Sequence, residues 1–406
     1  MNKFDKFVFF TCVIDNLFLP YFWLISVPLT MPLVFYWFIK RQSHLNKNNE
    51  YKLFRIMLII MCFSSVIGFL IAPEFLYKNI VYLITFTLIF LYYFIFTYYI
   101  NNSRFNVNNF LIVFIIFVDV LAIFYNFDKA LYQNIKLFWN FRSNAFDSSY
   151  TGFIGYRYSF IWMDPNNIAY IMNALVLYLW CNNNTNFFVK TFSLFSLLFV
   201  LVSCMSSGGF IAFIICASLY LLSIVINLLK GNISFKVRIT LINYILFVIS
   251  VLLILYIIPK IPVYLQTNTA LESLERIENN SGESRFIIWK RILNNIDFFE
   301  YLRLLIVGNG GVTLVDGVKV SPHNGHLYWI INYGFISYCI FMYIVFRKRR
   351  VTPIKNYIWI IPVLIGFTVN VMVGEVKLMG IVFLLIACST SKKYLNNSFE
   401  YENQKK

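Results

Sequence analysis

Long apolar stretches separated by short polar connections run along almost the whole chain. Most are close to the roughly 20 residues that a helix needs to cross the hydrocarbon core of a bilayer. Only a helix satisfies all of its own backbone hydrogen bonds in lipid, apart from a closed barrel. The pattern therefore predicts an all-α integral membrane protein, with apolar runs at 7–39, 53–72, 79–100, 108–125, 166–181, 187–204, 208–228, 239–258, 327–346, 356–373 and 375–389.

The first apolar run is too long for one helix and contains Asp15, Asn16 and Pro20 near its middle. We split it there into two helices, which gives about twelve transmembrane helices. With a cytoplasmic N-terminus, this topology places most of the 34 Lys and Arg residues inside, as the positive-inside rule requires. A single first helix would place the basic run Arg347–Arg350 outside. The split topology also leaves the C-terminus in the cytoplasm.

The topology defines one polytopic membrane domain over 1–390, followed by a cytoplasmic polar tail over 391–406. Two extracytoplasmic loops, about 126–165 and 259–326, are too long to be simple connectors. Function in a protein of this kind usually resides in loops that a rigid helical scaffold positions. Among the outer residues, Lys377 is assigned to a short connection.

Composition agrees with the membrane assignment and excludes several other classes. Of the 406 residues, 60% are apolar and only 13% are charged, whereas soluble domains carry roughly 25% charged residues. The net charge of +16 does not indicate nucleic-acid binding, because the basic residues are dispersed among apolar runs. No His/Cys cluster has metal-ligand spacing, and a disulfide framework is not expected from cysteines that all lie in or beside apolar runs, namely Cys12, Cys62, Cys181, Cys204, Cys216, Cys339 and Cys388.

The second long loop contains a predicted helix within 283–307. Phe286, Trp289, Leu293 and Ile296 recur at spacings of three and four, which is one stripe of a helix. A half-apolar helix beside a membrane often lies flat in the interface. Its cations, Arg285, Lys290 and Arg291, either bind a specific ligand or touch lipid phosphates generally.

Arg157 stands in an aromatic segment shortly before Asp164-Pro165-Asn166. Asp164 or Asn166 is suited to cap the next helix, with Pro165 in its first turn. A guanidinium binds phosphate with two parallel hydrogen bonds and keeps its charge at any accessible pH. The segment is therefore either a plain loop-to-helix junction or a phosphate contact.

His323, Asn324 and His326 lie where the chain re-enters the membrane, just before a helix predicted to begin near Leu327. A helix N-terminus carries partial positive charge and unpaired N–H donors, so it suits a phosphate-bearing lipid. Simple capping or solvent exposure is the other interpretation of these side chains.

Two glycine-containing segments predict turns. Gly308-Asn309-Gly310-Gly311 lacks the Gly-Lys-Ser/Thr ending of a nucleotide-binding loop and is expected outside the cell, so we interpret it as a turn. Ser206-Ser207-Gly208-Gly209 connects two spans, and its small residues let helices approach closely.

Asp119 lies inside a predicted span. An acid within the membrane is costly and is usually paired or functional. The residue keeps a transporter hypothesis open, although a proton relay usually needs several such groups.

This combination of features resembles the O-antigen polymerase and O-antigen ligase group. The resemblance covers nearly the whole chain through its topology, and three local motifs support it. Arg157 before Asp164-Pro165-Asn166 looks like the group's Arg…Pro-Asn segment. Arg285 before Trp289, with Gly308-x-Gly310 further on, looks like its Arg-x-x-x-Trp segment. His323-Asn324-x-x-Leu327, ahead of Gly334, looks like its His-Asn segment.

One departure concerns the segment between the seventh and eighth helices, where members of the group often carry a Ser-Arg pair. This chain has Ser206-Ser207-Gly208-Gly209 there. A phosphate contact from this turn would have to come from backbone N–H groups or hydroxyls.

The resemblance implies a glycosyltransferase of the lipid-dependent, GT-C-like kind, in the bacterial inner membrane. Its donor would be an undecaprenyl-diphosphate-linked oligosaccharide, with no cofactor and no metal, since no Asp-x-Asp is present. Fixed cations can stabilise the departing diphosphate. We assign Arg157 and Arg285 to the diphosphate, with Arg291 and Asn324 as further contacts. His323 is the candidate base because histidine titrates near working pH, and Glu283 is the alternative base.

Three functions remain open at this stage. The first is a polymerase that joins lipid-linked repeat units, with a chain-length regulator and a flippase as further partners and no nucleic acid. The Asn-, Ile-, Lys-, Phe- and Tyr-rich composition is typical of variable surface-polysaccharide genes and favours this function. The second is a ligase that moves finished glycan to lipid A core. The third is a flippase or other transporter, which predicts inverted repeats and paired intramembrane charges.

Overall fold

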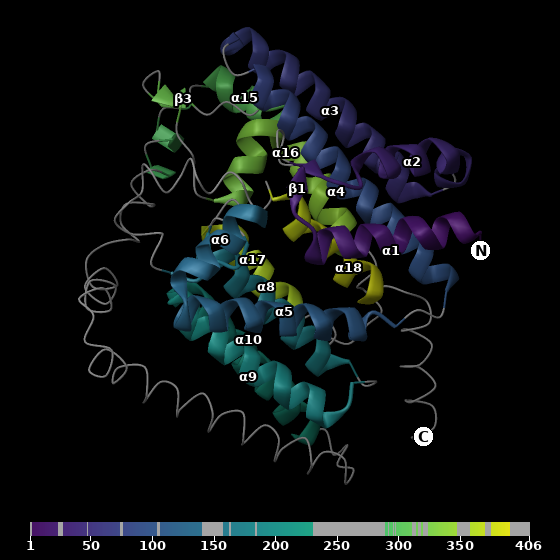
Figure 1. Ribbon diagram of the computed structural model, residues 1–406. Coiled ribbons are helices and arrows are strands. Elements are labelled where there is room, and N and C mark those ends of the chain that lie inside the picture. Colours follow the sequence, from purple (N-terminus) through teal and green to yellow (C-terminus); the bar gives the residue numbers. More distant parts are fainter. Residues whose placement is uncertain are drawn as a thin grey trace.

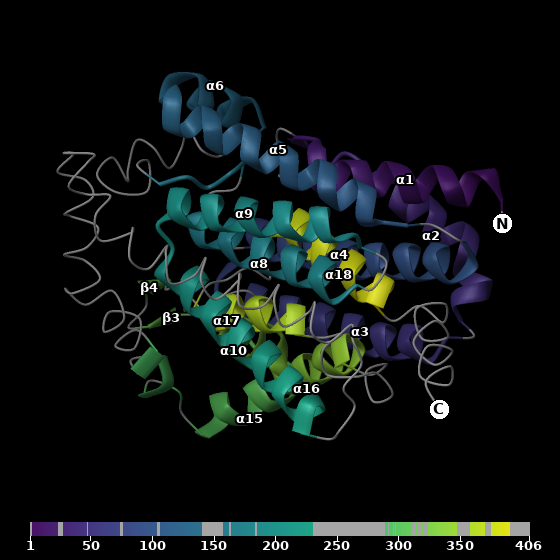
Figure 2. The ribbon, with the colours of Figure 1, turned by 90° about the horizontal axis from the view of Figure 1, so that it is seen from below.

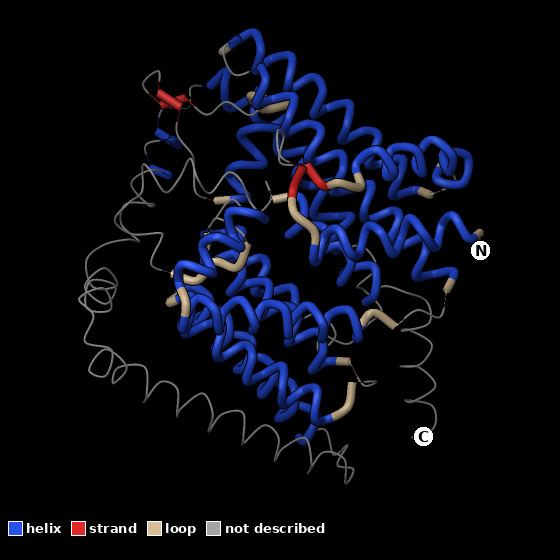
Figure 3. Tube along the Cα trace, viewed as in Figure 1, coloured by secondary structure: helices blue, strands red, loops and turns tan. Residues whose placement is uncertain are grey.

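The computed structural model describes residues 2–139, 157–229 and 289–389, with short gaps at 23–26, 47, 74–75, 104–105, 162–163, 183–184, 291, 295, 297, 311–313, 316–317, 320–323, 347–357 and 370–374. Within these residues the chain is helical except for connections and two hairpins (Figure 3). The hairpins pair β1 (Tyr21–Phe22) with β2 (Val27–Pro28) and β3 (Leu314–Val315) with β4 (Val318–Lys319). The helices are α1 (Lys3–Phe18), α2 (Met31–Leu45), α3 (Asn49–Ile71), α4 (Leu76–Asn102), α5 (Asn108–Phe127), α6 (Lys129–Trp139), α8 (Pro165–Cys181), α9 (Phe187–Cys204), α10 (Ser207–Leu229), α15 (Phe298–Ile306), α16 (Gly325–Phe346), the 3-10 turn η5 (Ile358–Ile360), α17 (Ile361–Val369) and α18 (Val376–Ser389).

Several of these helices are long and apolar enough to cross a membrane. By length and composition they are Asn49–Ile71, Ile80–Asn102, Asn108–Phe127, Phe187–Cys204 and Gly325–Phe346. Shorter apolar helices accompany them at Ser207–Tyr220, Ile358–Val369 and Val376–Ser389. The chain is therefore an all-α, multi-pass membrane protein (Figure 1).

The first apolar run forms two helices, as the sequence predicted. Helix α1 ends at Phe18, the β1–β2 hairpin follows, and α2 begins at Met31. Pro20 lies at the break, and proline has no N–H to continue a helix. The break is wider than a kink, because the described residues between 19 and 30 form the β1–β2 hairpin and its flanking turns.

Buried helices form the centre of the bundle, and partly exposed ones surround them. Every residue of α18 is buried, and α18 packs against α4 and α1 (Figure 2). By contrast, α3 exposes Ile56, Ile59, Phe63, Val66 and Leu70, which recur every three or four residues along one face. In a membrane protein an exposed apolar face of this kind contacts lipid.

The first long loop contains a helix that the sequence pattern did not reveal. Helix α6 follows α5 after a single residue and buries Tyr132 and Lys136 while exposing Leu131 and Phe138. In Figures 1 and 2, α6 lies on the same side of the bundle as β3, opposite the start of α1.

Candidate functional site

Arg157 is held against the end of α9. Its Nε donates to the carbonyl oxygen of Cys204 at 2.8 Å, and its Nη2 donates to that of Met205 at 2.9 Å. The last carbonyls of a helix lack intrahelical partners and carry partial negative charge. A guanidinium therefore suits this position, and the side chain remains partly exposed.

Asn166 joins Arg157 to the turn between α9 and α10. Its Oδ1 lies 3.5 Å from Arg157 Nη2 and accepts a hydrogen bond of 2.7 Å from the hydroxyl of Ser206. The same hydroxyl accepts from the backbone N–H of Gly209 at 3.1 Å. The turn carries no arginine of its own, yet the Arg157 guanidinium lies against its backbone at Met205.

The small residues of this turn allow close packing, as predicted. A Cβ added at Gly208 would lie 2.1 Å from the hydroxyl oxygen of Tyr170. One added at Gly209 would lie 2.7 Å from the Cβ of Ala169. Any larger residue would push the start of α10 away from α8, so the glycines fix the distance between these helices.

The start of α8 confirms the predicted cap. Asp164 is the N-cap residue, and its Oδ1 accepts from the backbone N–H of Asn166 at 2.7 Å. Pro165 occupies the first helical position, where its missing N–H costs nothing. Arg157 and Asn166 are thus positioned by the end of one helix and the start of another.

Three tyrosines that the sequence analysis did not single out support the Arg157 segment. The hydroxyl of Tyr132 donates to the carbonyl of Phe160 at 2.8 Å. The same hydroxyl accepts from the backbone N–H of Ser159 at 3.2 Å. The rings of Tyr125, Tyr132 and Tyr158 contact one another. Burial raises the pKa of the Tyr132 hydroxyl well above its usual value, so it remains a neutral donor. The available signal was the four-residue spacing of Tyr132 and Lys136, which places both side chains on one face of α6.

Asn324 is the N-cap residue of α16. Its Oδ1 accepts from the backbone N–H groups of His326 and Leu327, each at 3.0 Å. The capping that the sequence offered as one interpretation is therefore present, and its assignment to a diphosphate stays a prediction. His323, Arg285, Glu283 and Arg291 lie outside the described residues.

Arg157 and Asn324 lie at the same end of the helical bundle. The indole of Trp139, in the helix that supports the Arg157 segment, donates to the carbonyl of Phe18 at the end of α1 at 2.8 Å. The ring of His326, two residues after Asn324, contacts the ring of Phe367 near the end of α17. The ends of α1 and α17 lie at the same end of the bundle. Helix α18 begins only a few residues after α17, and Lys377 in the first turn of α18 is bonded to Asp15 near the end of α1. We term this the Arg157 end.

The glycines at 308 and 310 form a turn, as predicted. Gly308 has φ 78° and Gly310 has φ 60°, both in the left-handed region that favours glycine. The turn follows α15 directly and is buried.

A buried ion pair at the Arg157 end was missed. Lys377 does not lie in an outer connection: it is in the first turn of α18 and is buried. Its Nζ donates to Asp15 Oδ1 at 2.8 Å and to the carbonyls of Leu19 and Pro20 at 2.6 and 3.0 Å. The earlier interpretation failed because a lysine at the edge of an apolar run resembles a loop residue. Asp15 inside an apolar run was the available signal.

Asp119 on α5 is hydrogen-bonded to α9. The hydroxyl of Ser196 donates to its Oδ2 at 2.5 Å, and among the described residues its buried Oδ1 has no hydrogen-bond partner. The residue therefore faces another span.

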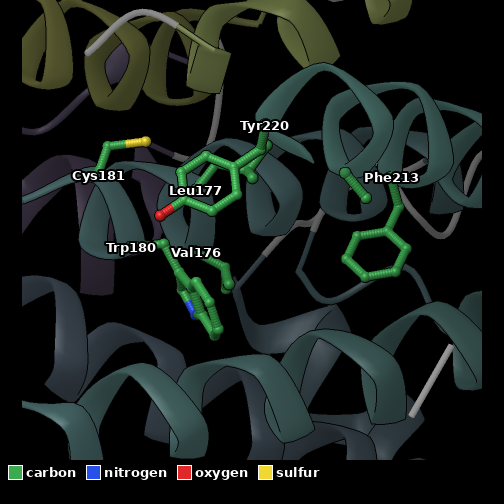
Figure 4. A pocket seen from close by; sticks show the side chains of 7 residues that line it. Val176, Leu177, Trp180, Cys181, Phe213 and Tyr220 are labelled. Carbon is green, nitrogen blue, oxygen red and sulfur yellow. The ribbon is translucent and has the colours of Figure 1, made fainter. Parts of the chain in front are cut away.

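A small pocket between α8 and α10 is apolar and lies away from Arg157. Figure 4 shows Val176, Leu177, Trp180 and Phe213 around it. Val176, Leu177 and Trp180 belong to the later turns of α8, whereas Arg157 lies by its first turn. In the part of the chain that the structure describes, no group of three or more His, Cys, Asp or Glu is placed to hold a metal ion.

The fold and the site define a multi-pass membrane protein, and comparisons with known proteins add no narrower class. No family model, curated protein or solved structure matches the chain.

Proposed function

We propose that this chain is a polymerase of bacterial surface polysaccharide, which joins undecaprenyl-diphosphate-linked repeat units on the periplasmic face of the inner membrane. The observation that carries the proposal is the fixed guanidinium of Arg157 at one end of a multi-pass bundle. Three backbone and side-chain acceptors orient it, so little reorganisation is needed when charge develops nearby.

The proposed reaction moves a glycan from one lipid carrier to another. The bond between the donor's anomeric carbon and the diphosphate oxygen breaks, and an acceptor hydroxyl oxygen bonds to that carbon. The hydroxyl proton goes to His323, with Glu283 as the alternative base. The leaving undecaprenyl diphosphate takes the electron pair, and Arg157, Arg285 and Arg291 offset its charge, with Asn324 as a neutral contact. These roles rest on the sequence motifs.

A multi-pass bundle suits such a donor. The polyprenyl chain is insoluble in water and reaches the enzyme through lipid, whereas the sugars and diphosphate stay at the membrane surface. A cation at the end of the bundle meets the diphosphate at that level. Lysine is a poor substitute, because it lacks the planar fork that binds two phosphate oxygens at once.

The test uses purified protein and a synthetic lipid-diphosphate repeat unit, with and without chelator. We expect polymer in both conditions. Arg157→Ala and His323→Ala should lower the rate by at least about 100-fold, the usual scale for losing one transition-state donor or base. Arg157→Lys should recover only a small part.

Arg55→Ala is the matched control, because Arg55 is exposed on the first turns of α3, away from the Arg157 end. Equal rates for Arg157→Ala and Arg55→Ala would refute the proposal. A deletion strain separates polymerase from ligase: loss of a polymerase leaves a single repeat unit on the lipopolysaccharide, and loss of a ligase leaves none.

A further inference from the structure

Helix α16 is interrupted a little before its midpoint. Gly334 has φ 81° and ψ 158°, which breaks the helical backbone. A Cβ added at Gly334 would lie 2.5 Å from the carbonyl oxygen of Ile306, the last residue of α15. One added at Gly308 would lie 2.6 Å from the backbone nitrogen of Gly334. The break in α16 and the turn after α15 are therefore in direct backbone contact.

The turn satisfies the carbonyls that the break releases. The backbone N–H of Asn309 donates to the carbonyl of Ile331, and that of Gly310 donates to the carbonyl of Asn332, both at 2.7 Å. On the other side, the hydroxyl of Ser64 in α3 donates to the carbonyl of Val307. Non-helical backbone is tolerated at membrane depth only where protein satisfies it in this way.

Two helices independently give the depth of the turn. A Cβ at Gly310 would lie 2.0 Å from the carbonyl oxygen of Ser64, which precedes the end of α3 at Ile71 by seven residues. Asn332 follows the start of α16 at Gly325 by the same number. At 1.5 Å per residue, each count places the turn about 10 Å inside the ends of the spans. Half the hydrocarbon core measures about 15 Å.

On the face of α3, lipid contact extends closer to the membrane surface than Ser64. Phe69 and Leu70, in its last turn, are 41% and 73% exposed. Since α3 is a membrane span, these side chains contact acyl chains, and Ser64 lies further inside.

Helix α15 has the surface of a segment within lipid. It packs on α16 through Leu304, and most of its other side chains are exposed and apolar, namely Phe298, Phe299, Tyr301, Leu302, Leu305 and Ile306. Its two charged residues are paired, because Arg303 Nη2 lies 3.4 Å from Glu300 Oε1. Asn309 also donates to that oxygen at 2.9 Å.

We infer that α15 and the Gly308–Gly310 turn form a re-entrant segment, which enters the bilayer from the Arg157 end and rests its exposed face on lipid acyl chains. After the turn, the described residues continue with the β3–β4 hairpin and with α16, which is long and apolar enough to cross the membrane. The face of α15 thereby continues the lipid-facing surface of α3. This inference is independent of the proposed reaction and differs from the expectation that the glycine turn lies outside the cell.

The test measures the depth of a nitroxide spin label in reconstituted phospholipid vesicles. Ile306→Cys carries the label in a chain whose exposed native cysteines, Cys62 and Cys339, are replaced by alanine. The native Cys62 of α3, two residues before Ser64, gives the reference for a lipid-facing position when it alone is labelled. Asn102→Cys, at the exposed end of α4, gives the aqueous reference.

We expect the label at position 306 to collide with oxygen several-fold more often, relative to a water-soluble nickel chelate, than the label at 102. The ratio should approach that of Cys62. Leu302→Cys, one helical turn earlier, provides a second site if the first variant folds poorly. A ratio at 306 equal to that at 102 overturns the inference, whatever the enzyme's activity.

Discussion

Asp15 on α1 and Lys377 on α18 form a buried ion pair, with 2.8 Å between Oδ1 and Nζ, although 362 positions separate them. The other carboxylate oxygen accepts from both the backbone N–H and the hydroxyl of Thr30, at 2.7 and 2.6 Å. That hydroxyl lies 2.6 Å from the hydroxyl of Tyr92 on α4. Asp15 thus joins α1, α18 and the start of α2, and Thr30 extends the network to α4.

We predict that removing either charge alone destabilises the protein strongly. Asp15→Asn or Lys377→Met leaves the other charge buried without its partner, which costs about 3–5 kcal/mol. The midpoint of thermal unfolding in detergent should fall in both variants. The double variant should recover part of the loss.

The control is the pair between Asp5 and Arg41, whose arginine side chain is 25% exposed. Arg41→Met should cost less, because solvent screens and partly hydrates the remaining charge. Equal midpoints for Lys377→Met and wild type would show that the buried pair contributes nothing.

We predict that Gly310→Ala is among the most destabilising single-methyl additions in the described part of the chain. A left-handed φ costs a non-glycine residue roughly 1–2 kcal/mol. The added methyl would also overlap the backbone of Ser64, and overpacking adds about 1–3 kcal/mol. Detergent-solubilised yield and thermal midpoint measure the effect.

Ser65→Ala tests the specificity of that result. Ser65 lies beside the same turn, but its hydroxyl bonds only within α3, to the carbonyl of Met61 at 3.0 Å. A midpoint near that of wild type is expected. A larger loss for Ser65→Ala than for Gly310→Ala would contradict the contact between the turn and α3.

The sequence predicted the described apolar helices well because a membrane helix carries its signal locally, and the total of about twelve spans stays a prediction. The apolar runs 53–72, 108–125 and 187–204 correspond closely to α3, α5 and α9. Lipid imposes one requirement on every residue along such a run, so no knowledge of neighbours is needed. The prediction of two helices in the first run succeeded for the same reason, since Pro20 interrupts the pattern locally.

Contacts between distant segments were not predictable in this way. The pairing of Lys377 with Asp15 becomes evident only once α1 and α18 are packed together. Arg157 was singled out by its charge, but its two shortest hydrogen bonds go to backbone carbonyls, which give no signal in the sequence. The depth of the Gly308–Gly310 turn was hidden too, because its polar composition resembles that of a surface loop.

We predict that Tyr132→Phe weakens the support of the Arg157 segment. The change leaves the backbone N–H of Ser159 and the carbonyl of Phe160 without this partner, at a cost of about 1–3 kcal/mol. Polymer formation should fall while the protein remains folded, with a smaller loss than for Arg157→Ala. Leu131→Phe, at an exposed position of the same helix, should leave both properties unchanged.

We predict that Asp119→Asn leaves polymer length unchanged. If the protein were instead a proton-coupled transporter that uses Asp119, the same change would abolish its activity. Asparagine keeps an oxygen that accepts from Ser196 at the same position, and it loses only the capacity to exchange a proton. Polymer length on the lipopolysaccharide of a complemented deletion strain is the measurement, with Ser196→Ala as the companion variant. If Asp119→Asn eliminates polymer while Arg157→Ala, Arg285→Ala and His323→Ala all retain it, a transporter mechanism replaces the proposed transferase. The comparison is informative because Asp119 faces a neighbouring span, whereas Arg157 lies at the end of the bundle.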